Sequence, residues 1–245
     1  MTIALVAASH GTSVPAAQMA ITALVDAVRD ASPHLDVREA FVDVQEPRLY
    51  DVVDSVGGLS VVVPLLLTAG FHLRVDVARA ADRPNAVAAR VLGPDPHLTS
   101  VLLRRLQQCG ATRNDFVVLG AAGSTDPRAL RDVLAAARQV GSVWGSPIPV
   151  GYVSGAGTPI ADIVREAARS GRRVVVASHV MAPGFFYEQL QASGADVVSR
   201  PLLDGTSVEP EMVSLVLDRF AEGAGRLDWS SAAAAVRCNE TSRLR

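Results

Sequence analysis

Apolar, strand-length runs alternate with helix-length segments along this chain, and the same alternation occurs twice. The strands and helices expected in the first half occupy, in turn, residues 3–8, 15–31, 37–44, 47–56, 59–67, 74–81, 87–91 and 96–109. Those of the second half occupy residues 116–119, 127–139, 148–153, 159–169, 173–177, 196–199 and 209–221. Strands that are separated by helices pair in parallel through right-handed crossovers. The sequence therefore predicts an α/β fold with two tandem lobes, each a small parallel sheet flanked by helices.

The repeat also sets the expected domain boundaries. We assign residues 1–113 to the first lobe, residues 114–222 to the second and residues 223–245 to a flexible tail. A chain of 245 residues is long enough for two domains of this size. Only 4% of the residues are aromatic, so Val, Leu, Ile and Ala must supply the core, as suits strands that are buried on both faces.

An alignment of the two halves distinguishes residues that shape the turns in both halves from possible metal ligands found in one. It pairs His10 with Ala122, Asp43 with Gly155, Pro47 with Pro159 and His72 with Phe186. Glycines and prolines at the turns recur in both halves, whereas at the three aligned ligand positions metal-binding residue types occur only in the first half. Structural histidines would have a similar reason to persist in both halves. The difference therefore favours a functional role for the histidines of the first lobe.

His10, Asp43 and His72 each follow a different strand of the first predicted sheet. The carboxyl ends of parallel strands share one edge of the sheet, and ligands of doubly wound folds bind there. Two imidazoles and a carboxylate suit a divalent metal such as Fe²⁺, Co²⁺, Ni²⁺ or Zn²⁺. Three protein ligands also leave coordination positions open for a substrate. We therefore predict a metal site in the first lobe, with His10, Asp43 and His72 as its ligands.

Each of these assignments has a structural alternative. A single histidine at a strand end is more often a capping or hydrogen-bonding residue than a metal ligand. Asp43 can instead cap the helix expected to begin at Pro47. Glu46 has the same ambiguity, and its position favours a role at the N-terminus of that helix. Asp76 is expected in the first turn of the next helix or as a hydrogen-bonding partner of His72.

The remaining histidines give weaker signals. His34 and His97 each follow a proline and are expected in surface turns. His179 lies at the end of the main strand of the second lobe and aligns with Leu65 rather than with an expected ligand. It is either a substrate contact or a packed residue, and we keep it as a reserve candidate for the site.

Composition excludes several classes of protein. The chain has 23 basic and 25 acidic residues and shows no basic stripe, so nucleic acid is not an expected partner. Its two cysteines cannot form a disulfide framework, and no apolar run has the length of a membrane helix. The first residues are typical of a strand rather than a signal peptide, so we expect a cytoplasmic protein. The glycine-containing turns at 120–124 and 155–157 lack a complete dinucleotide motif and a Walker lysine, so no ATP or other nucleotide is expected.

Three segments of the first half resemble the class II, ATP-independent chelatases of the sirohydrochlorin and cobalt chelatase family. The segments are Ser9-His10-Gly11-Thr12, Phe41-Val42-Asp43-Val44-Gln45-Glu46-Pro47 and Val63-Pro64-Leu65-Leu66-Leu67-Thr68-Ala69-Gly70-Phe71-His72. The resemblance is strong in the first lobe and faint in the second. The glutamate that is usual in the second segment of the family is replaced here by Asp43, whose side chain is one methylene shorter.

The resemblance implies two flavodoxin-like, chelatase-like lobes with a tetrapyrrole in the cleft between them. It implies Fe²⁺ insertion into sirohydrochlorin without ATP, with cobalt insertion for cobalamin, or non-catalytic binding of a metal or tetrapyrrole, as alternatives. The histidines would bind the metal and help to accept the pyrrole protons. The weaker substrate contacts that it implies are Ser9, Gly11, Thr12, Ser13, Arg74 and Arg79. A monomer would suffice, since the second lobe would supply the other wall of the cleft.

Overall fold

The computed structural model describes residues 3–68 and 70–227, without the side chains of residues 71–74. Two four-stranded, wholly parallel sheets form the two lobes, with strand orders β2-β1-β3-β4 and β6-β5-β7-β8. The first sheet contains β1 (Ile3–Ser9), β2 (Asp36–Phe41), β3 (Leu59–Pro64) and β4 (Ala86–Ala88). The second contains β5 (Phe116–Ala121), β6 (Val150–Tyr152), β7 (Val174–His179) and β8 (Val197–Val198). The predicted α/β fold with two parallel sheets is confirmed.

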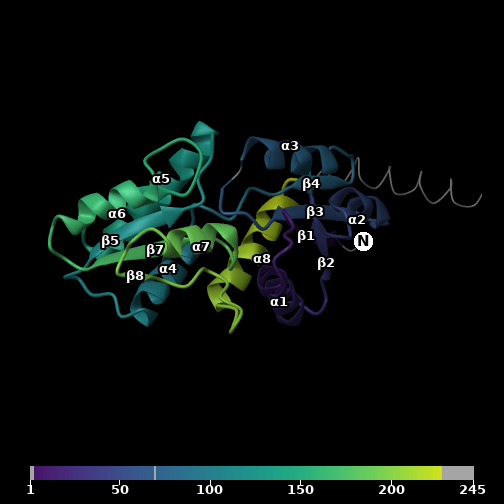
Figure 1. Ribbon diagram of the computed structural model, residues 1–245. Helices are drawn as coiled ribbons and strands as arrows, with labels where there is room; N and C mark the ends of the chain where they lie inside the picture. Colours follow the sequence, from purple (N-terminus) through teal and green to yellow (C-terminus); the bar gives the residue numbers. More distant parts are fainter. Residues whose placement is uncertain (1–2, 69, 228–245) are drawn as a thin grey trace, which may run out of the picture.

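Helices cover both faces of each sheet (Figure 1). They are α1 (Pro15–Ala31), α2 (Leu49–Ser55), α3 (Phe71–Ala80), α4 (Pro96–Gln108), α5 (Pro127–Trp144), α6 (Ile160–Ala168), α7 (Phe185–Gln191) and α8 (Pro210–Ala224). Helices α2 and α3 pack on the outer face of the first sheet, and α6 and α7 pack on the outer face of the second. Within the described residues, none of the helices is long and apolar enough to cross a membrane.

Proline fixes where four of these helices begin. Pro15, Pro96, Pro127 and Pro210 occupy the first turn of α1, α4, α5 and α8, where the missing N–H has no intrahelical partner to lose. Two predicted starts are wrong by a few residues, because α2 begins at Leu49 and α3 already begins at Phe71. Helix α7 is absent from the prediction, although the repeat places its start opposite that of α3.

The helices α4 and α8 connect the two lobes, because each packs on the sheet of the opposite half of the chain. Helix α4 lies within residues 1–113, yet it contacts β7 and α5 of the second lobe. Helix α8 ends the second half and contacts β3 and α1 of the first lobe. Gly223 of α8 lies so close to Val61 of β3 that a methyl group at this position would overlap the valine side chain. One continuous apolar core therefore extends through both lobes.

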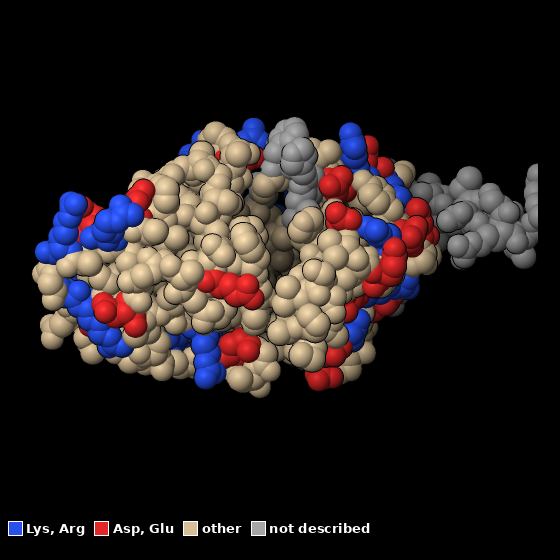
Figure 2. Space-filling view, viewed as in Figure 1, with Lys and Arg blue, Asp and Glu red and all other residues tan. Residues whose placement is uncertain are grey.

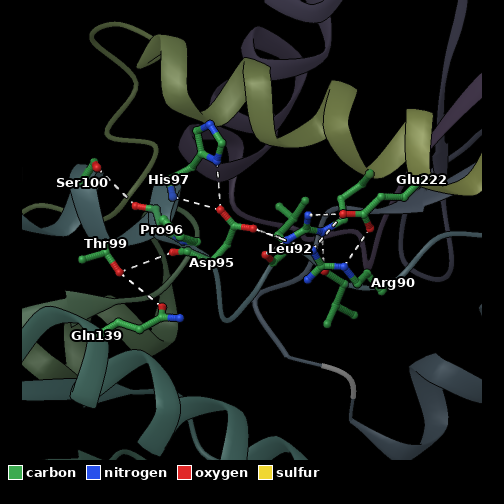
Figure 3. Close-up of polar contacts among 11 residues, drawn as sticks. Arg90, Leu92, Asp95, Pro96, His97, Thr99, Ser100, Gln139 and Glu222 are labelled. Atoms are coloured by element: carbon green, nitrogen blue, oxygen red, sulfur yellow. Dashed lines mark hydrogen bonds and ion pairs between the residues drawn. The ribbon is translucent and has the colours of Figure 1, made fainter.

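Two buried arginines hold these exchanged helices in place. Arg219 of α8 is 1% exposed and donates hydrogen bonds to the carbonyl oxygens of Val91 and Leu92, at 2.9 and 2.7 Å. Its guanidinium also lies 2.6 Å from the carboxylate of Asp95, which accepts a hydrogen bond from the N–H of His97 at the start of α4. Figure 3 shows Asp95 beside His97, and the neighbouring ion pair between Arg90 and Glu222. His97 thus belongs to this junction between the lobes, not to the surface turn predicted for it.

Arg105 of α4 makes equivalent contacts with the second lobe. Arg105 of α4 is also 1% exposed and donates to the carbonyl oxygens of Pro201 and Leu202 in the second lobe. Its charge is balanced by Glu209 and Asp204, at 3.0 and 3.5 Å. The repeat therefore includes the contacts that join the lobes.

Strand register tests the alignment of the two halves. Ala8 pairs with Pro64 as Gly120 pairs with Ser178, which confirms the match of β1 and β3 to β5 and β7. In the next loop the predicted match is wrong by one residue. The N–H of Asp43 donates to the carbonyl of His10, and the N–H of Ser154 donates to the carbonyl of Ala122.

The equivalent of Asp43 is therefore Ser154 and not Gly155. The carbonyl of Pro47 accepts from Phe41 as that of Thr158 accepts from Tyr152, so Pro47 corresponds to Thr158 and not to Pro159. A deletion of one residue between β5 and β6, relative to the first half, produces this shift.

Replacing Arg219 by Met should strongly destabilise the protein, because it removes the charged partner of the Asp95 carboxylate and the donor to the carbonyls of Val91 and Leu92. We expect the free energy of unfolding in urea to fall by about 3–5 kcal/mol. Arg226 offers a matched control, because it also donates to a carbonyl of the first lobe, that of Ala88, but is exposed. Arg226→Met should lower the free energy of unfolding by less than about 1 kcal/mol. Equal losses in the two variants would contradict the role assigned to Arg219.

Candidate metal and tetrapyrrole site

A cavity of about 480 Å³ lies between the two lobes, where the carboxyl ends of β1, β3, β5 and β7 meet. Figure 2 shows the hollow between the lobes. Among the described lining residues, none is Asp, Glu, Lys or Arg, and the ionisable side chains are those of His10 and His179. A mostly apolar pocket with a few convergent polar groups is the usual form of a small-molecule site.

His10 lies at the rim of this cavity, directly after the last residue of β1. Its carbonyl accepts a hydrogen bond of 2.9 Å from the N–H of Asp43, so the loops after β1 and β2 lie against each other. Gly11 makes this approach possible. It has a φ of +91°, and a side chain there would overlap the carbonyl oxygen of Asp43. The predicted position of His10 at the sheet edge is thus set by backbone contacts.

Gln45 holds the loop that follows His10. Its Oε1 accepts a hydrogen bond of 2.9 Å from the N–H of Thr12, and its side chain lines the cavity. Gln18 of α1 donates to the carbonyl of Thr12 at 2.7 Å. Ser9, Gly11, Thr12 and Ser13 all line the cavity, as the predicted substrate contacts require. The N–H of Thr12 is already hydrogen-bonded to Gln45. The Thr12 hydroxyl accepts a hydrogen bond from the N–H of Val14 and is the group of Thr12 that a ligand could contact.

Asp43 lies near His10 but is not among the cavity-lining residues. Its carboxylate accepts hydrogen bonds from the N–H of Val44 at 2.8 Å and from Arg48 at 3.1 Å. These two donors, together with the charge of His10, keep the pKa of Asp43 below its usual value. The alternative prediction that Asp43 caps the following helix is wrong, because α2 begins after Arg48 and has no side-chain cap. Val44 has a φ of +64°, a conformation that strains a β-branched residue.

The remaining candidate site residues form two groups: some lie away from the cavity, and the side chains of others are not described by the structure. Glu46 pairs with Arg48 at 2.9 Å and does not line the cavity. Asp76 is not in the first turn of its helix, because α3 begins at Phe71; its carbonyl accepts a hydrogen bond from Tyr50. The side chains of His72 and Arg74 lie outside what the structure describes. Their backbone is in the first turn of α3, and the proposed ligand set of His10, Asp43 and His72 therefore remains a prediction. Among the described side chains there is no group of three metal-binding residues.

His179 ends β7 and lines the cavity from the second lobe. The residue is 3% exposed, and its Nε2 has no hydrogen-bond partner among the described residues. Burial lowers the pKa of His179 to about 4, so its imidazole is neutral at pH 7. His179 follows the paired residues Gly120 and Ser178 as Leu65 follows Ala8 and Pro64, which confirms the alignment of His179 with Leu65.

The second lobe supplies an apolar wall that the sequence had not singled out. Met181, Phe185 and Phe186 line the cavity, and the two phenylalanines are 60% and 42% exposed. Gly184 caps α7 as Gly70 caps α3, which confirms that Phe186 occupies the place of His72 in the repeat. The alignment of Phe186 with His72 is the sequence signal that marks this wall.

Comparison with known proteins agrees with this arrangement. Residues 4–109 match the protein family described as CbiX, and this match covers β1 to α4. The first lobe therefore resembles the CbiX family. No curated protein sequence matches the chain.

Solved structures extend the likeness over both lobes. SirB from Bacillus subtilis with Fe³⁺ has a TM-score of 0.75 and 21% identity, over 94% of this chain and 100% of that one. SirB from Bacillus subtilis subspecies spizizenii in complex with cobalt has a TM-score of 0.71 and 20% identity over the same shares. CbiX, described as the terminal enzyme for siroheme biosynthesis in denitrifying bacteria, has a TM-score of 0.64 and 18% identity, over 91% of this chain and 99% of that one. At these identities the likeness establishes the chelatase fold of the two lobes.

The buried His179 should make the protein sensitive to acid. Unfolded chains bind a proton at this imidazole below a pH of about 6.5, whereas the folded protein resists protonation until about pH 4. The stability that His179 contributes is thus present above pH 6.5 and is lost as the pH falls towards 4. His179→Leu should remove this loss. Between about pH 7.5 and pH 5, the free energy of unfolding of the wild type should fall by about 2 kcal/mol more than that of the variant. If the difference in free energy of unfolding between the wild type and His179→Leu does not change with pH, the burial of a neutral imidazole at His179 is contradicted.

Proposed function

We propose that this protein is an ATP-independent chelatase that inserts Fe²⁺ into sirohydrochlorin. The observation that carries the proposal is the position of His10, at the rim of a mostly apolar cavity between two lobes of chelatase fold. The lobe that presents His10 is also the part of the chain that matches the CbiX family model. The occupancy of related structures by Fe³⁺ and by cobalt supports a metal ion as one substrate of this fold.

In the proposed reaction, His10 and His72 bind the incoming metal ion, and Asp43 supplies a carboxylate beside them. Two pyrrole nitrogens must each lose a proton as the metal–nitrogen bonds form, and a histidine can accept a proton near neutral pH. The apolar cavity excludes water from the ring, which strengthens the attraction between the metal ion and the nitrogen lone pairs. Thr12, held by Gln45 and Gln18, positions the loop that carries His10.

Cobalt insertion at the same site is the second candidate, because the donor set does not distinguish Fe²⁺ from Co²⁺ and cobalt has the higher intrinsic affinity. One structural observation favours a third, non-catalytic role in binding. The carboxylate of Asp43 is engaged by Arg48 and lies away from the cavity lining, so it is partly withdrawn from a metal at His10. Anaerobic insertion assays with Fe²⁺, Co²⁺ and Ni²⁺ in competition distinguish these three roles.

His10→Ala and His72→Ala should each reduce the rate of metal insertion by roughly 10²-fold or more, because each removes a metal ligand and a proton acceptor. The measurement is the anaerobic change in the absorption of sirohydrochlorin after Fe²⁺ is added. His34→Ala is the control, since His34 is exposed in a turn after α1 and does not line the cavity. Wild-type insertion no faster than the uncatalysed reaction, with all three metals, would overturn the proposed function.

Asp43→Ala should weaken Co²⁺ binding by roughly tenfold if the carboxylate reaches the metal or orients His10. Titration calorimetry with Co²⁺ in the absence of a tetrapyrrole measures this directly. Glu46→Ala is a matched control, because Glu46 pairs with the same Arg48 but lies away from the cavity. Equal affinities in Asp43→Ala and the wild type would remove Asp43 from the site and leave the histidines as its ligands.

A further inference from the structure

The two walls of the cavity differ in chemistry. From the first lobe come the polar side chains of Ser9, His10, Thr12, Ser13, Gln45 and Thr68. Among the described lining residues of the second lobe, the polar side chains are those of Ser124 and His179, and the imidazole of His179 is buried. The wall from the first lobe, where the metal is expected, therefore carries most of the polar side chains, whereas the wall from the second lobe is mostly apolar.

Phe185 and Phe186 are the most unusual feature of the apolar wall. Their rings pack edge to face, with centroids 5.4 Å apart and an interplanar angle of 72°. Both remain substantially exposed, although Phe is among the residues most often buried in folded proteins. Exposed aromatic side chains that line a cavity commonly mark a ligand-binding surface.

The exposure of this pair does not come from a loosely attached helix. Leu190 of α7 is fully buried in the core on the outer face of the second sheet. It packs so closely on β5 that Gly120 has no room for a side chain beneath it. At the other end of α7, a methyl group added at Gly184 would be in van der Waals contact with Val14 of the first lobe. The aromatic pair is therefore fixed beside the loop that carries His10.

We propose that Phe186, supported by Phe185, binds one face of the planar tetrapyrrole ring and determines which ring systems the cavity accepts. The proposal rests on the proposed function for the identity of the ring. A conjugated macrocycle has a flat apolar face, which suits the wall that the second lobe presents, and its central nitrogens must remain open to the metal on the other side. In the repeat Phe186 occupies the place of His72, so the second lobe has a ring contact where the first has a metal ligand.

Binding of metal-free sirohydrochlorin, measured by quenching of its fluorescence, tests this assignment separately from catalysis. Phe186→Ala should raise the dissociation constant by roughly tenfold to a hundredfold, because it removes both apolar contact area and stacking. The dissociation constant of Phe186→Trp should stay within roughly threefold of the wild-type value, and that of Phe186→Leu should lie between those of Phe186→Trp and Phe186→Ala. Co²⁺ affinity in the absence of a tetrapyrrole should stay unchanged in all three variants, since the metal binds the opposite wall.

Met19→Ala is the matched control, because Met19 is 67% exposed on α1 and is not part of the cavity lining. Its dissociation constant for sirohydrochlorin should equal that of the wild type. The molecular mass of each variant in solution tests the other possible occupant of the apolar wall, a second copy of this chain. If the wild type self-associates and Phe186→Ala abolishes this without changing ring affinity, the proposal is overturned.

The outcomes also separate this proposal from the proposed function. If the wild type inserts metal but Phe186→Ala binds the ring as tightly as the wild type does, the ring contact is overturned and the chelatase activity stands. If the wild type binds the ring without inserting metal, and Phe186→Ala loses binding, the ring contact stands and the catalytic role falls. A wild type that binds no sirohydrochlorin overturns both.

Discussion

The cavity between the lobes depends on two buried guanidinium groups. Arg219 reaches from α8 to the carbonyls of Val91 and Leu92, and Arg105 reaches from α4 to those of Pro201 and Leu202. Each of these carbonyl pairs follows the edge strand of a sheet, at a point where the chain leaves its own lobe. A buried carbonyl without a donor costs free energy, and a buried charge without a partner costs more. The carboxylates of Asp95 and Glu209 meet the second requirement.

This exchange of helices fixes the position of both walls of the site. A flexible linker between two separate domains would allow the cavity to open and close widely. Here the apolar core continues from the first sheet through α8 and α4 to the second, so the lobes move apart only if core contacts are lost. His10 and Phe186 therefore face a cavity whose width is set by the packing of the core. A site that distorts a rigid macrocycle needs walls of this kind, because a soft cleft would yield before the ring does.

The sequence was sufficient to predict most of the fold, because hydrophobic periodicity and helix-starting prolines are local signals. The prediction placed every strand and all helices but α7, which is short and follows a glycine-containing turn. The partners of α4 and α8 could not be predicted in the same way. Arg105 and Arg219 look like ordinary surface arginines on amphipathic helices, and only the tertiary structure shows that they are buried.

The site was predictable to a similar extent and for a related reason. His10 has the expected position because a residue that directly follows a buried parallel strand must lie at the edge of the sheet. Asp43 is farther from its strand, and the conformation of its loop depends on Arg48 and on the strained residue Val44, neither of which has a sequence signature. The phenylalanines of α7 were visible in the alignment, but their exposure was not. Burial depends on neighbours that are remote in sequence.

The one-residue shift between the halves shows which constraint the repeat has kept. Gly11 and Gly123 have nearly the same φ, and in each case a side chain would overlap a carbonyl oxygen of the following loop. That oxygen belongs to Asp43 in one lobe and to Ser154 in the other, and the Ser154 hydroxyl donates back to the carbonyl of Ala122. Backbone contact thus persists while the side chain facing it changes from a carboxylate to a hydroxyl that is already hydrogen-bonded. Because the scaffold is held by backbone and core, each lobe is free to present different chemistry at the same edge. The proposed metal-binding wall and ring-binding wall can therefore arise from two copies of one unit.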